Sequence, residues 1–277
     1  MRVAILGMGA IGQVIARALD GRAELVPVDR TKLPLKPGEA PVEAAIIAAK
    51  TPGTVWAAEN AAKILAAEGV ALTIQNGLGN YEVLVDRLGP ARVAVGVIYV
   101  GAGFREDGTH YATGPGRIQL APPPGRDAAR RLDALVEALR MGGVEIEIVD
   151  DPWPAVWRKL VANAVVNAPS ALLDASYGEI LGDPSKALLC DGLARESARI
   201  VTAAGYACSE EQAMEAWRAI ARAMNHHRSS MHADLARRRQ TEVDAINGAL
   251  VREAERRGIA APLNQAMTLL VSSLSTV

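Results

Sequence analysis

A lysine and two asparagines recur at four-residue intervals in an apolar stretch, residues 157–170, with the sequence WRKLVANAVVNAPS. Because an α-helix completes a turn about every 3.6 residues, Lys159, Asn163 and Asn167 are expected to share one helix face. The other positions are mostly apolar, which predicts a helix buried nearly all round with a narrow polar stripe. Such a stripe could donate a proton and bind an oxygen-rich ligand. The pattern alone leaves a solvated stripe on a surface helix open.

A second candidate site lies where a short apolar run, residues 2–6, meets a glycine-rich loop with the sequence GMGAIG. A GxGxxG pattern between a predicted strand and a predicted helix is typical of dinucleotide-binding folds. Gly7 permits a tight turn, Gly9 lets a pyrophosphate approach, and Gly12 lets the helix pack on the strand. A glycine-rich turn in some other α/β unit is the alternative. The candidate cofactor-binding residues of the loop are Gly7, Met8, Gly9, Ala10, Ile11 and Gly12.

The end of the second predicted strand, residues 24–28, carries signals for two different cofactors. Asp29 lies 22 residues after Gly7, where an acidic side chain would bind the ribose 2′-hydroxyl of NAD. Arg30 and Lys32 lie where cations would bind the 2′-phosphate of NADP. These residues taken alone leave NAD and NADP both open.

Three more candidates follow predicted strands. Lys50 follows strand 43–49, Asn76 lies in the loop 75–80, and Gly103 follows strand 92–100 with room for close backbone approach. In a doubly wound sheet the carboxyl ends of the strands face the cofactor crevice. A solvated lysine and an ordinary turn asparagine are the alternatives at the first two positions.

The pattern of the chain changes near residue 151, where strand-like alternation gives way to helical periodicity. The predicted fold class is therefore α/β, with an N-terminal Rossmann-type doubly wound sheet over residues 1–150 and a C-terminal all-α domain over residues 151–277. Within the first domain, residues 109–112 and 117–120 flank a Gly-Pro-Gly turn and predict a hairpin. Within the second, one long helix is expected from about residue 230 to 257.

Composition excludes several classes of protein. A formal net charge of −1 argues against a protein that coats nucleic acid, and no apolar run is long enough for a membrane span. The two cysteines are too few for a disulfide framework, and no cysteine or histidine group has metal-ligand spacing, so no metal is expected. A cytoplasmic protein fits these features best, and the apolar second domain makes a homodimer plausible.

Five motifs occur together and in order: GMGAIG at 7–12, QNG at 75–77, WRKLVANAVVN at 157–167, SSM at 229–231 and TEVDAING at 241–248. In this combination the chain resembles the 2-dehydropantoate 2-reductases, also called ketopantoate reductases, over nearly its whole length. The pairing of KLxxNxxxN with the later SSMxxD and TExDxING motifs is far more specific than the glycine loop.

The resemblance implies NADPH-dependent reduction of 2-dehydropantoate to pantoate, a step of pantothenate and coenzyme A biosynthesis. In that family the lysine is the proton donor, so Lys159 takes this role here. Asn163, Asn167 and Ser230 match positions that bind the substrate. The residues that match cofactor-contacting positions are Arg30, Lys50, Asn76 and Glu242, the last on the ribose side.

The chain departs from the family pattern at a few positions. Asp29 precedes Arg30 where a small or apolar residue is more usual, so NAD stays a possible cofactor beside NADP. Tyr177 and His227 occupy positions where some members carry substrate-contacting asparagines, and Tyr177 is kept as a candidate substrate contact. The link between the second and third strands is also short for the family.

Two further points concern mechanism and class. Along an unbroken helix Glu242 would lie about 18 Å from Ser230, so the two could not bind one small acid unless the helix breaks. This places Ser230 on the substrate and Glu242 on the cofactor. A related dehydrogenase acting on another branched 2-oxo acid is the alternative enzyme, and a dinucleotide-binding sensor without turnover is the alternative class.

Overall fold

The computed structural model describes residues 1–29, 39–105 and 107–275, and the chain divides into two compact units. The first unit comprises Met1–Gln75 and Gly79–Pro152. The second comprises Trp153–Val277 together with the short segment Asn76–Leu78. Each unit has its own apolar core, so each is described by itself.

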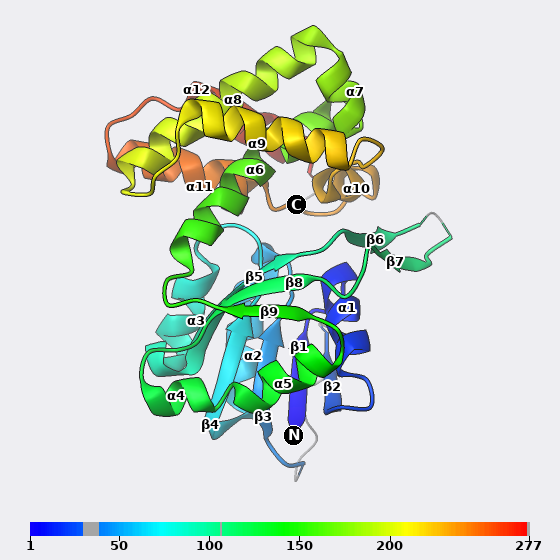
Figure 1. Cartoon of the computed structure of the whole chain (residues 1–277), viewed down its shortest axis with the longest axis vertical. Helices are drawn as coiled ribbons and strands as arrows, with labels where there is room; N and C mark the ends of the chain where they lie inside the picture. Colours follow the sequence, from blue (N-terminus) through cyan, green and yellow to red (C-terminus); the bar gives the residue numbers. More distant parts are fainter. Residues whose placement is uncertain (30–38, 106, 276–277) are drawn as a thin grey trace. The chain divides into compact units, whose positions relative to one another are not determined.

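The first unit is built on a seven-stranded sheet with the strand order β2-β1-β3-β4-β5-β8-β9 (Figure 1). Strands β2, β1, β3, β4 and β5 run parallel to one another. Strand β8 runs antiparallel to β5 and parallel to β9. The strand bounds are β1 Arg2–Leu6, β2 Glu24–Val28, β3 Val42–Ile47, β4 Leu65–Thr73, β5 Val93–Tyr99, β8 Arg117–Ala121 and β9 Glu145–Ile148.

Helices cover both faces of this sheet because its buried strands are apolar on both sides. Ile5 belongs to the core beneath α1 and α5, whereas its neighbour Leu6 belongs to the core beneath α2 and α3. This alternation follows from the two-residue period of a strand. The predicted Rossmann-type doubly wound sheet is thereby confirmed. The helix bounds are α1 Ala10–Leu19, α2 Thr54–Ile64, α3 Asn80–Leu88, α4 Arg126–Arg130 and α5 Asp133–Met141, with 3₁₀ turns at Thr51–Gly53 and Pro90–Arg92.

The predicted hairpin between residues 109–112 and 117–120 is wrong. Strand β7, His110–Ala112, instead pairs antiparallel with β6, Ala102–Phe104, in a separate two-stranded ribbon. Strand β8 returns to the main sheet beside β5, where Ile118 and Leu120 are fully buried. Burial of these two side chains in the large core outweighs the local turn signal.

From Trp153 onward, every regular element among the described residues is a helix, as predicted for this part of the chain (Figure 1). Its core is formed around α6, which packs against α8, α10, α11 and α12. The bounds are α6 Trp153–Leu172, α7 Tyr177–Gly182, α8 Pro184–Ala203, α9 Glu210–Ala223, α10 Ser230–Ala236, α11 Val243–Arg256 and α12 Pro262–Leu274.

A proline lies inside α6 without ending it. Pro169 has no N–H, so the carbonyl of Val165 lacks the donor that a helix normally supplies four residues later. The thiol of buried Cys190 on α8 donates to that carbonyl oxygen at 3.4 Å. The helix that carries the polar stripe therefore continues to Leu172 with its carbonyl satisfied by a neighbouring helix.

The long helix predicted from about residue 230 to 257 is also wrong, because it breaks between Ala236 and Val243. Arg238 has a φ of 51°, in the left-handed region, and the N–H of Arg239 donates back to the carbonyl of Asp234 at 2.8 Å. This is the bonding pattern of a Schellman C-cap, formed here without glycine. Glu242 becomes the N-cap residue of α11 instead of a mid-helix residue.

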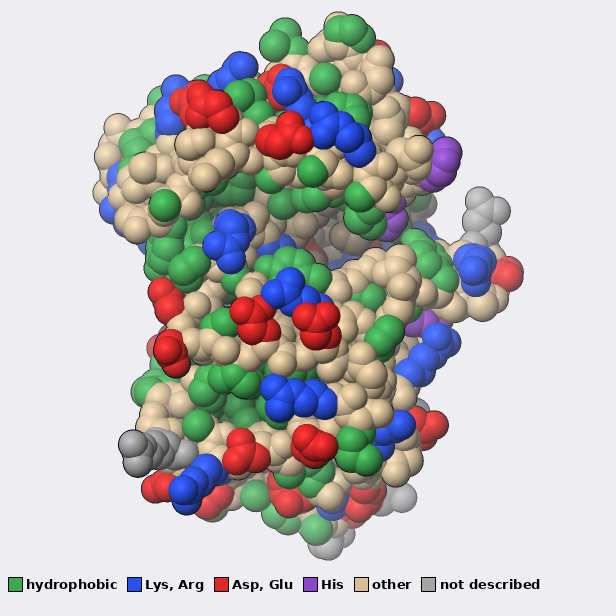
Figure 2. Space-filling model, in the orientation of Figure 1, with side chains coloured by type: hydrophobic (Ala, Val, Ile, Leu, Met, Phe, Trp, Pro, Cys, Tyr) green, Lys and Arg blue, Asp and Glu red, His purple; other side chains and the backbone are tan. Residues whose placement is uncertain are grey.

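The charges on the molecule are mixed. On the face drawn in Figure 2, basic and acidic side chains are interspersed, as the net charge of −1 leads one to expect. In the described part of the chain, no helix combines the length and apolar character needed to cross a bilayer.

Candidate functional site

The polar stripe predicted from four-residue spacing lies on α6 of the second unit. Lys159 and Asn163 are half-buried, and Asn167 is buried among apolar neighbours. Among the described residues, neither the Asn163 side chain nor the Asn167 Nδ2 group has a protein hydrogen-bond partner. The stripe therefore carries an ammonium group and two amides with hydrogen-bonding capacity to offer a ligand.

A buried tyrosine fixes the orientation of one amide. The Tyr177 hydroxyl at the start of α7 donates to Asn167 Oδ1 at 3.2 Å, and each side chain is 5 % exposed. Burial raises the pKa of the Tyr177 phenol above its usual range, so it remains a donor. Its ring lies edge-on to His227, whose pKa is lowered by burial. Because Oδ1 is occupied, Nδ2 is the group that Asn167 has left for a ligand.

Lys159 is held in a state unusual for a lysine. Burial lowers the pKa of its ammonium from 10.5 to about 8, and the negative charge of Glu242 opposes that shift. The break between α10 and α11 places this carboxylate within electrostatic reach of the amine. The distance derived for an unbroken helix therefore does not apply, and Glu242 acts on Lys159 itself.

Ser229 and Ser230, at the start of α10, differ in burial. Ser230, the residue predicted from the SSM motif, is exposed at the first position of the helix. Ser229 is buried: its hydroxyl donates to the Asn167 carbonyl at 2.9 Å, and its N–H donates to Ser170 Oγ at 3.1 Å. Ser229 was not among the predicted site residues, although a serine before a helix is a recognisable N-cap. Ser229 fixes α10, and hence Ser230, against α6.

The glycine loop lies in the first unit between β1 and α1, as predicted. Gly7 has a φ of 106°, and its N–H donates to the Val28 carbonyl at 3.1 Å. A Cβ at Gly12 would overlap the Gly7 carbonyl, whereas a Cβ at Gly9 would meet nothing within 4 Å. The N-terminus of α1 has no side-chain cap at Gly9. Open space before uncapped helix N–H groups fits a phosphate-binding loop.

The β6–β7 ribbon packs against this helix. His110 Nε2 lies 2.9 Å from the Ala10 carbonyl, and the His110 ring lies edge-on to Phe104. Gly103 was predicted to allow close approach of the cofactor. In the structure, Tyr111 lies on the side of Gly103 where a Cβ would project. The Tyr111 ring fills that space at 2.8–3.0 Å. Packing within the ribbon therefore requires a glycine here, and the predicted cofactor contact of Gly103 stays a prediction.

The remaining strand-end candidates fall in different units. Lys50 is exposed before the 3₁₀ turn that follows β3, in the first unit. Asn76 belongs to the second unit, where its neighbour Leu78 donates from its N–H to the Ala245 carbonyl of α11 at 3.0 Å. Asp29 directly follows β2 and is half-buried. Arg30 and Lys32 lie outside the described residues.

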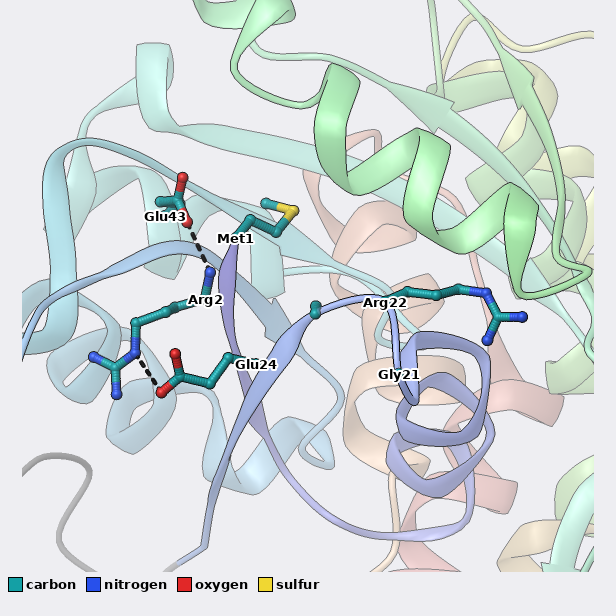
Figure 3. A pocket seen from close by; sticks show the side chains of 7 residues that line it. Met1, Arg2, Gly21, Arg22, Glu24 and Glu43 are labelled. Atoms are coloured by element: carbon teal, nitrogen blue, oxygen red, sulfur yellow. Dashed lines mark hydrogen bonds and ion pairs between the residues drawn. The ribbon is translucent and has the colours of Figure 1, made fainter.

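A shallow pocket of about 490 Å³ lies at the amino ends of β1, β2 and β3, whereas the glycine loop follows the carboxyl end of β1 (Figure 3). The start of β1, the turn before β2 and Glu43 line it, and Arg2 is held there by Glu24 at 2.8 Å. Ligands of doubly wound sheets bind at the carboxyl ends of the strands, so this amino-end pocket is not the candidate site. No cluster of potential metal ligands occurs among the described residues.

The fold is therefore a Rossmann-type dinucleotide-binding sheet followed by an all-α unit that carries a lysine–asparagine stripe. Residues 30–125 match the family profile described as "Ketopantoate reductase PanE/ApbA", and residues 152–275 match "Ketopantoate reductase PanE/ApbA C terminal". The chain belongs to the ketopantoate reductase PanE/ApbA family, which confirms the resemblance seen in its motifs.

Individual relatives agree with this placement. The 2-dehydropantoate 2-reductase of Pyrobaculum aerophilum is 31 % identical over 290 residues, covering 97 % of this chain and 96 % of that protein. The crystal structure of 2-dehydropantoate 2-reductase from Geobacter metallireducens has a TM-score of 0.84 at 26 % identity, covering 99 % of this chain and 100 % of that one. A D-mandelate dehydrogenase with NADH and anilino(oxo)acetate has a TM-score of 0.87 at 19 % identity, covering 99 % and 98 %, and shares the fold.

Proposed function

We propose that this protein reduces 2-dehydropantoate to pantoate with NADPH, a step of pantothenate and coenzyme A biosynthesis. The observation that carries the proposal is the α6 stripe, where a lysine of lowered pKa lies one turn from an amide that offers its hydrogen bonds to a ligand. A 2-oxo acid presents a carboxylate and a carbonyl oxygen, and both accept hydrogen bonds from such groups. The curated relative from Pyrobaculum aerophilum bears the name of this activity.

Lys159 is the proposed proton donor. When bound, the reduced nicotinamide supplies a hydride to the carbonyl carbon of the substrate. The carbonyl oxygen then gains negative charge, which the Lys159 ammonium stabilises before it transfers a proton to that oxygen. A pKa of about 8 leaves the amine mostly protonated at neutral pH yet makes it a stronger acid than a solvated lysine.

The proposed substrate contacts are Asn163, Asn167, Ser230 and Tyr177. Asn163 and the Asn167 Nδ2 group are suited to donate to substrate oxygens, and Tyr177 acts by holding the Asn167 amide in that orientation. Glu242, assigned to the cofactor's ribose side from the family resemblance, is proposed in addition to tune Lys159 through its charge.

The proposed cofactor site is the loop of Gly7, Met8, Gly9, Ala10, Ile11 and Gly12 at the N-terminus of α1. Open space at Gly9 and uncapped helix N–H groups suit a pyrophosphate. Lys50, Asn76, Gly103 and Glu242 remain proposed contacts from their positions in the sequence. Arg30 is proposed to bind the 2′-phosphate of NADP, with NAD as the alternative because of Asp29.

Two other properties are proposed. Cys190 and Cys208 are both free thiols, which suits the reducing cytoplasm. Apolar side chains on α12, Leu269, Leu270 and Leu274, are each at least half exposed, which suits burial in a homodimer. Sedimentation of the purified protein at several concentrations tests the second proposal.

The reaction is tested by ketopantoate-dependent oxidation of NADPH, with pantoate identified by mass spectrometry. NADH is compared at the same concentration, and 3-methyl-2-oxobutanoate, which lacks the hydroxymethyl group of ketopantoate, serves as the substrate control. We expect NADPH and ketopantoate to give the highest kcat/KM. Faster turnover of another branched 2-oxo acid would support the related dehydrogenase. Binding of NADPH without oxidation by any 2-oxo acid would support the sensor.

Arg30→Ala and Asp29→Ala form a matched pair for the choice of cofactor. Arg30→Ala is expected to weaken NADPH use selectively, whereas Asp29→Ala is expected to strengthen it by removing a negative charge near the 2′-phosphate. Preference of the unmodified enzyme for NADH, with a ratio unchanged in Arg30→Ala, would assign the ribose site to Asp29.

A further inference from the structure

Asn247, a buried asparagine on α11, forms a hydrogen bond to Ala164 on α6. Lys159 lies five residues before Ala164, and Glu242 lies five residues before Asn247. At about 1.5 Å per residue, the backbone of each functional residue is about 7.5 Å along its own chain segment from that point. Asn247 Nδ2 donates to the Ala164 carbonyl at 3.1 Å, so a hydrogen bond joins the two helices five residues after Lys159 on α6 and five residues after Glu242 at the start of α11.

This hydrogen bond is itself held by a chain of buried polar groups. Asn247 Nδ2 also donates to Asn264 Oδ1 at 3.0 Å, and Asn264 Nδ2 donates to Glu196 Oε1 at 2.9 Å. The Glu196 carboxylate further accepts from the backbone N–H groups of Leu263 and Asn264 at the start of α12. Asn247 and Asn264 are 0 % exposed. The chain of contacts fixes α11 in position relative to α6, α8 and α12.

The Asn247 amide is only partly satisfied by its neighbours. Asn247 Oδ1 is buried and has no hydrogen-bond partner among the described residues. A leucine of similar size would remove this unpartnered acceptor, but it would also leave the buried Asn264 Oδ1 without the donor that Asn247 Nδ2 supplies. The group that the asparagine supplies, and a leucine does not, is an Nδ2 donor shared by the Ala164 carbonyl of α6 and Asn264 Oδ1 of α12.

The first turn of α11 has a second partner. The Ala245 carbonyl accepts from the N–H of Leu78 at 3.0 Å, and Gly77 packs so closely on Ala245 that a Cβ would lie 2.5 Å from that carbonyl oxygen. The position of α11 therefore determines the position of Glu242 and of the segment that carries Asn76. A residue that fixes α11 against α6 therefore influences the positions of both Glu242 and the Asn76 segment.

We propose that Asn247 is a positioning residue, whose hydrogen bond to the Ala164 carbonyl sets the separation between the Lys159 ammonium and the Glu242 carboxylate. The proposal rests on the proposed function for its catalytic consequence, but the separation itself exists without substrate. Loss of the hydrogen bond lets the helices shift, the carboxylate acts less on the amine, and the amine loses its proton at lower pH.

Competitive acetylation of the cofactor-free protein measures this directly. Acetic anhydride reacts with neutral amines, so the pH at which Lys159 is half-reactive, read by peptide mass spectrometry, reports its protonation. The wild-type midpoint is expected near 8. Asn247→Leu is expected to lower it, and to lower ketopantoate turnover about tenfold with little change in NADPH affinity. Asn247→Ser, whose short side chain does not span to α6, provides a second variant with the same expectation.

Leu250→Ala is the matched control, because Leu250 lies on the same helix, is fully buried and does not contact Ala164 through a hydrogen bond. It is expected to lower the melting temperature while leaving the Lys159 midpoint unchanged. Folded Asn247 variants with an unchanged or raised midpoint would overturn the proposal, as would an equal shift in Leu250→Ala. A wild-type protein that fails to reduce ketopantoate would overturn the proposed function and leave the acetylation result standing.

Discussion

Lys159 of α6 and Glu242 at the N-cap of α11 act on each other electrostatically across two helices of the same unit. Burial lowers the pKa of the Lys159 ammonium, and the Glu242 carboxylate limits the fall to about 8. At pH 7 roughly ten lysines carry a proton for each that does not, yet the proton is released far more readily than from a solvated lysine. The pair is therefore suited to general acid catalysis near neutral pH.

Glu242→Gln is expected to move the basic limb of the kcat profile to lower pH. The substitution removes the charge that raises the pKa of Lys159, so that pKa falls further. Because the acid must be protonated to act, activity is then lost at a lower pH than in the wild type. The profile is measured with saturating ketopantoate and NADPH. A basic limb that stays in place or moves upward would show that Glu242 does not act on the proton donor.

Gly9→Ala is expected to separate cofactor binding from folding. Gly9 has a φ of −72°, which alanine adopts readily, and a Cβ there meets no atom within 4 Å. The melting temperature should therefore change little. The methyl group would occupy the space through which a pyrophosphate approaches the backbone, so NADPH affinity should fall about tenfold or more. Fluorescence titration measures the affinity, and unchanged binding would place the pyrophosphate elsewhere.

Gly12→Ala is the companion variant, since its Cβ would overlap the Gly7 carbonyl. It is expected to destabilise the β1–α1 connection itself, with a lowered melting temperature. The contrast between the two glycines distinguishes a ligand approach from close helix packing. Equal loss of stability in both would contradict the assignment of open space to Gly9.

The internal geometry of the lysine–asparagine stripe could be predicted from sequence, and so could that of the glycine loop, because each depends on local backbone geometry. Four-residue spacing places Lys159, Asn163 and Asn167 on one face of any α-helix, whatever it packs against. The glycines of the loop are required by backbone geometry within six residues. The same local rules explain why the two fold classes along the chain were predicted correctly.

Other features depended on contacts that sequence patterns do not display. The break after α10 is made by Arg238 in a left-handed conformation, and no glycine or proline marks it. The coupling of Glu242 to Lys159 follows from that break and was missed with it. Similarly, Gly114-Pro115-Gly116 indicates that the chain turns, but the partner of β8 is decided by burial of Ile118 in the main sheet.

Tyr177→Phe is expected to raise the KM for ketopantoate about fivefold while kcat changes less. The substitution removes the hydroxyl that donates to Asn167 Oδ1, so the amide is free to rotate away from the orientation that presents Nδ2. Loss of one buried hydrogen bond also costs about 1 kcal/mol of folding stability. Steady-state kinetics and thermal denaturation check the two effects. A lowered melting temperature with unchanged KM would limit Tyr177 to a structural role.

The most direct test of the account is the turnover of Lys159→Met. Methionine is close to lysine in length and carries no charge, so the substitution removes the half-buried ammonium with little change in side-chain volume, and the fold should be retained. We predict that ketopantoate reduction falls by a factor of about 10² or more, as for loss of a general acid, while NADPH affinity stays nearly unchanged. Near-normal turnover in this folded variant would contradict the assignment of Lys159 as the proton donor.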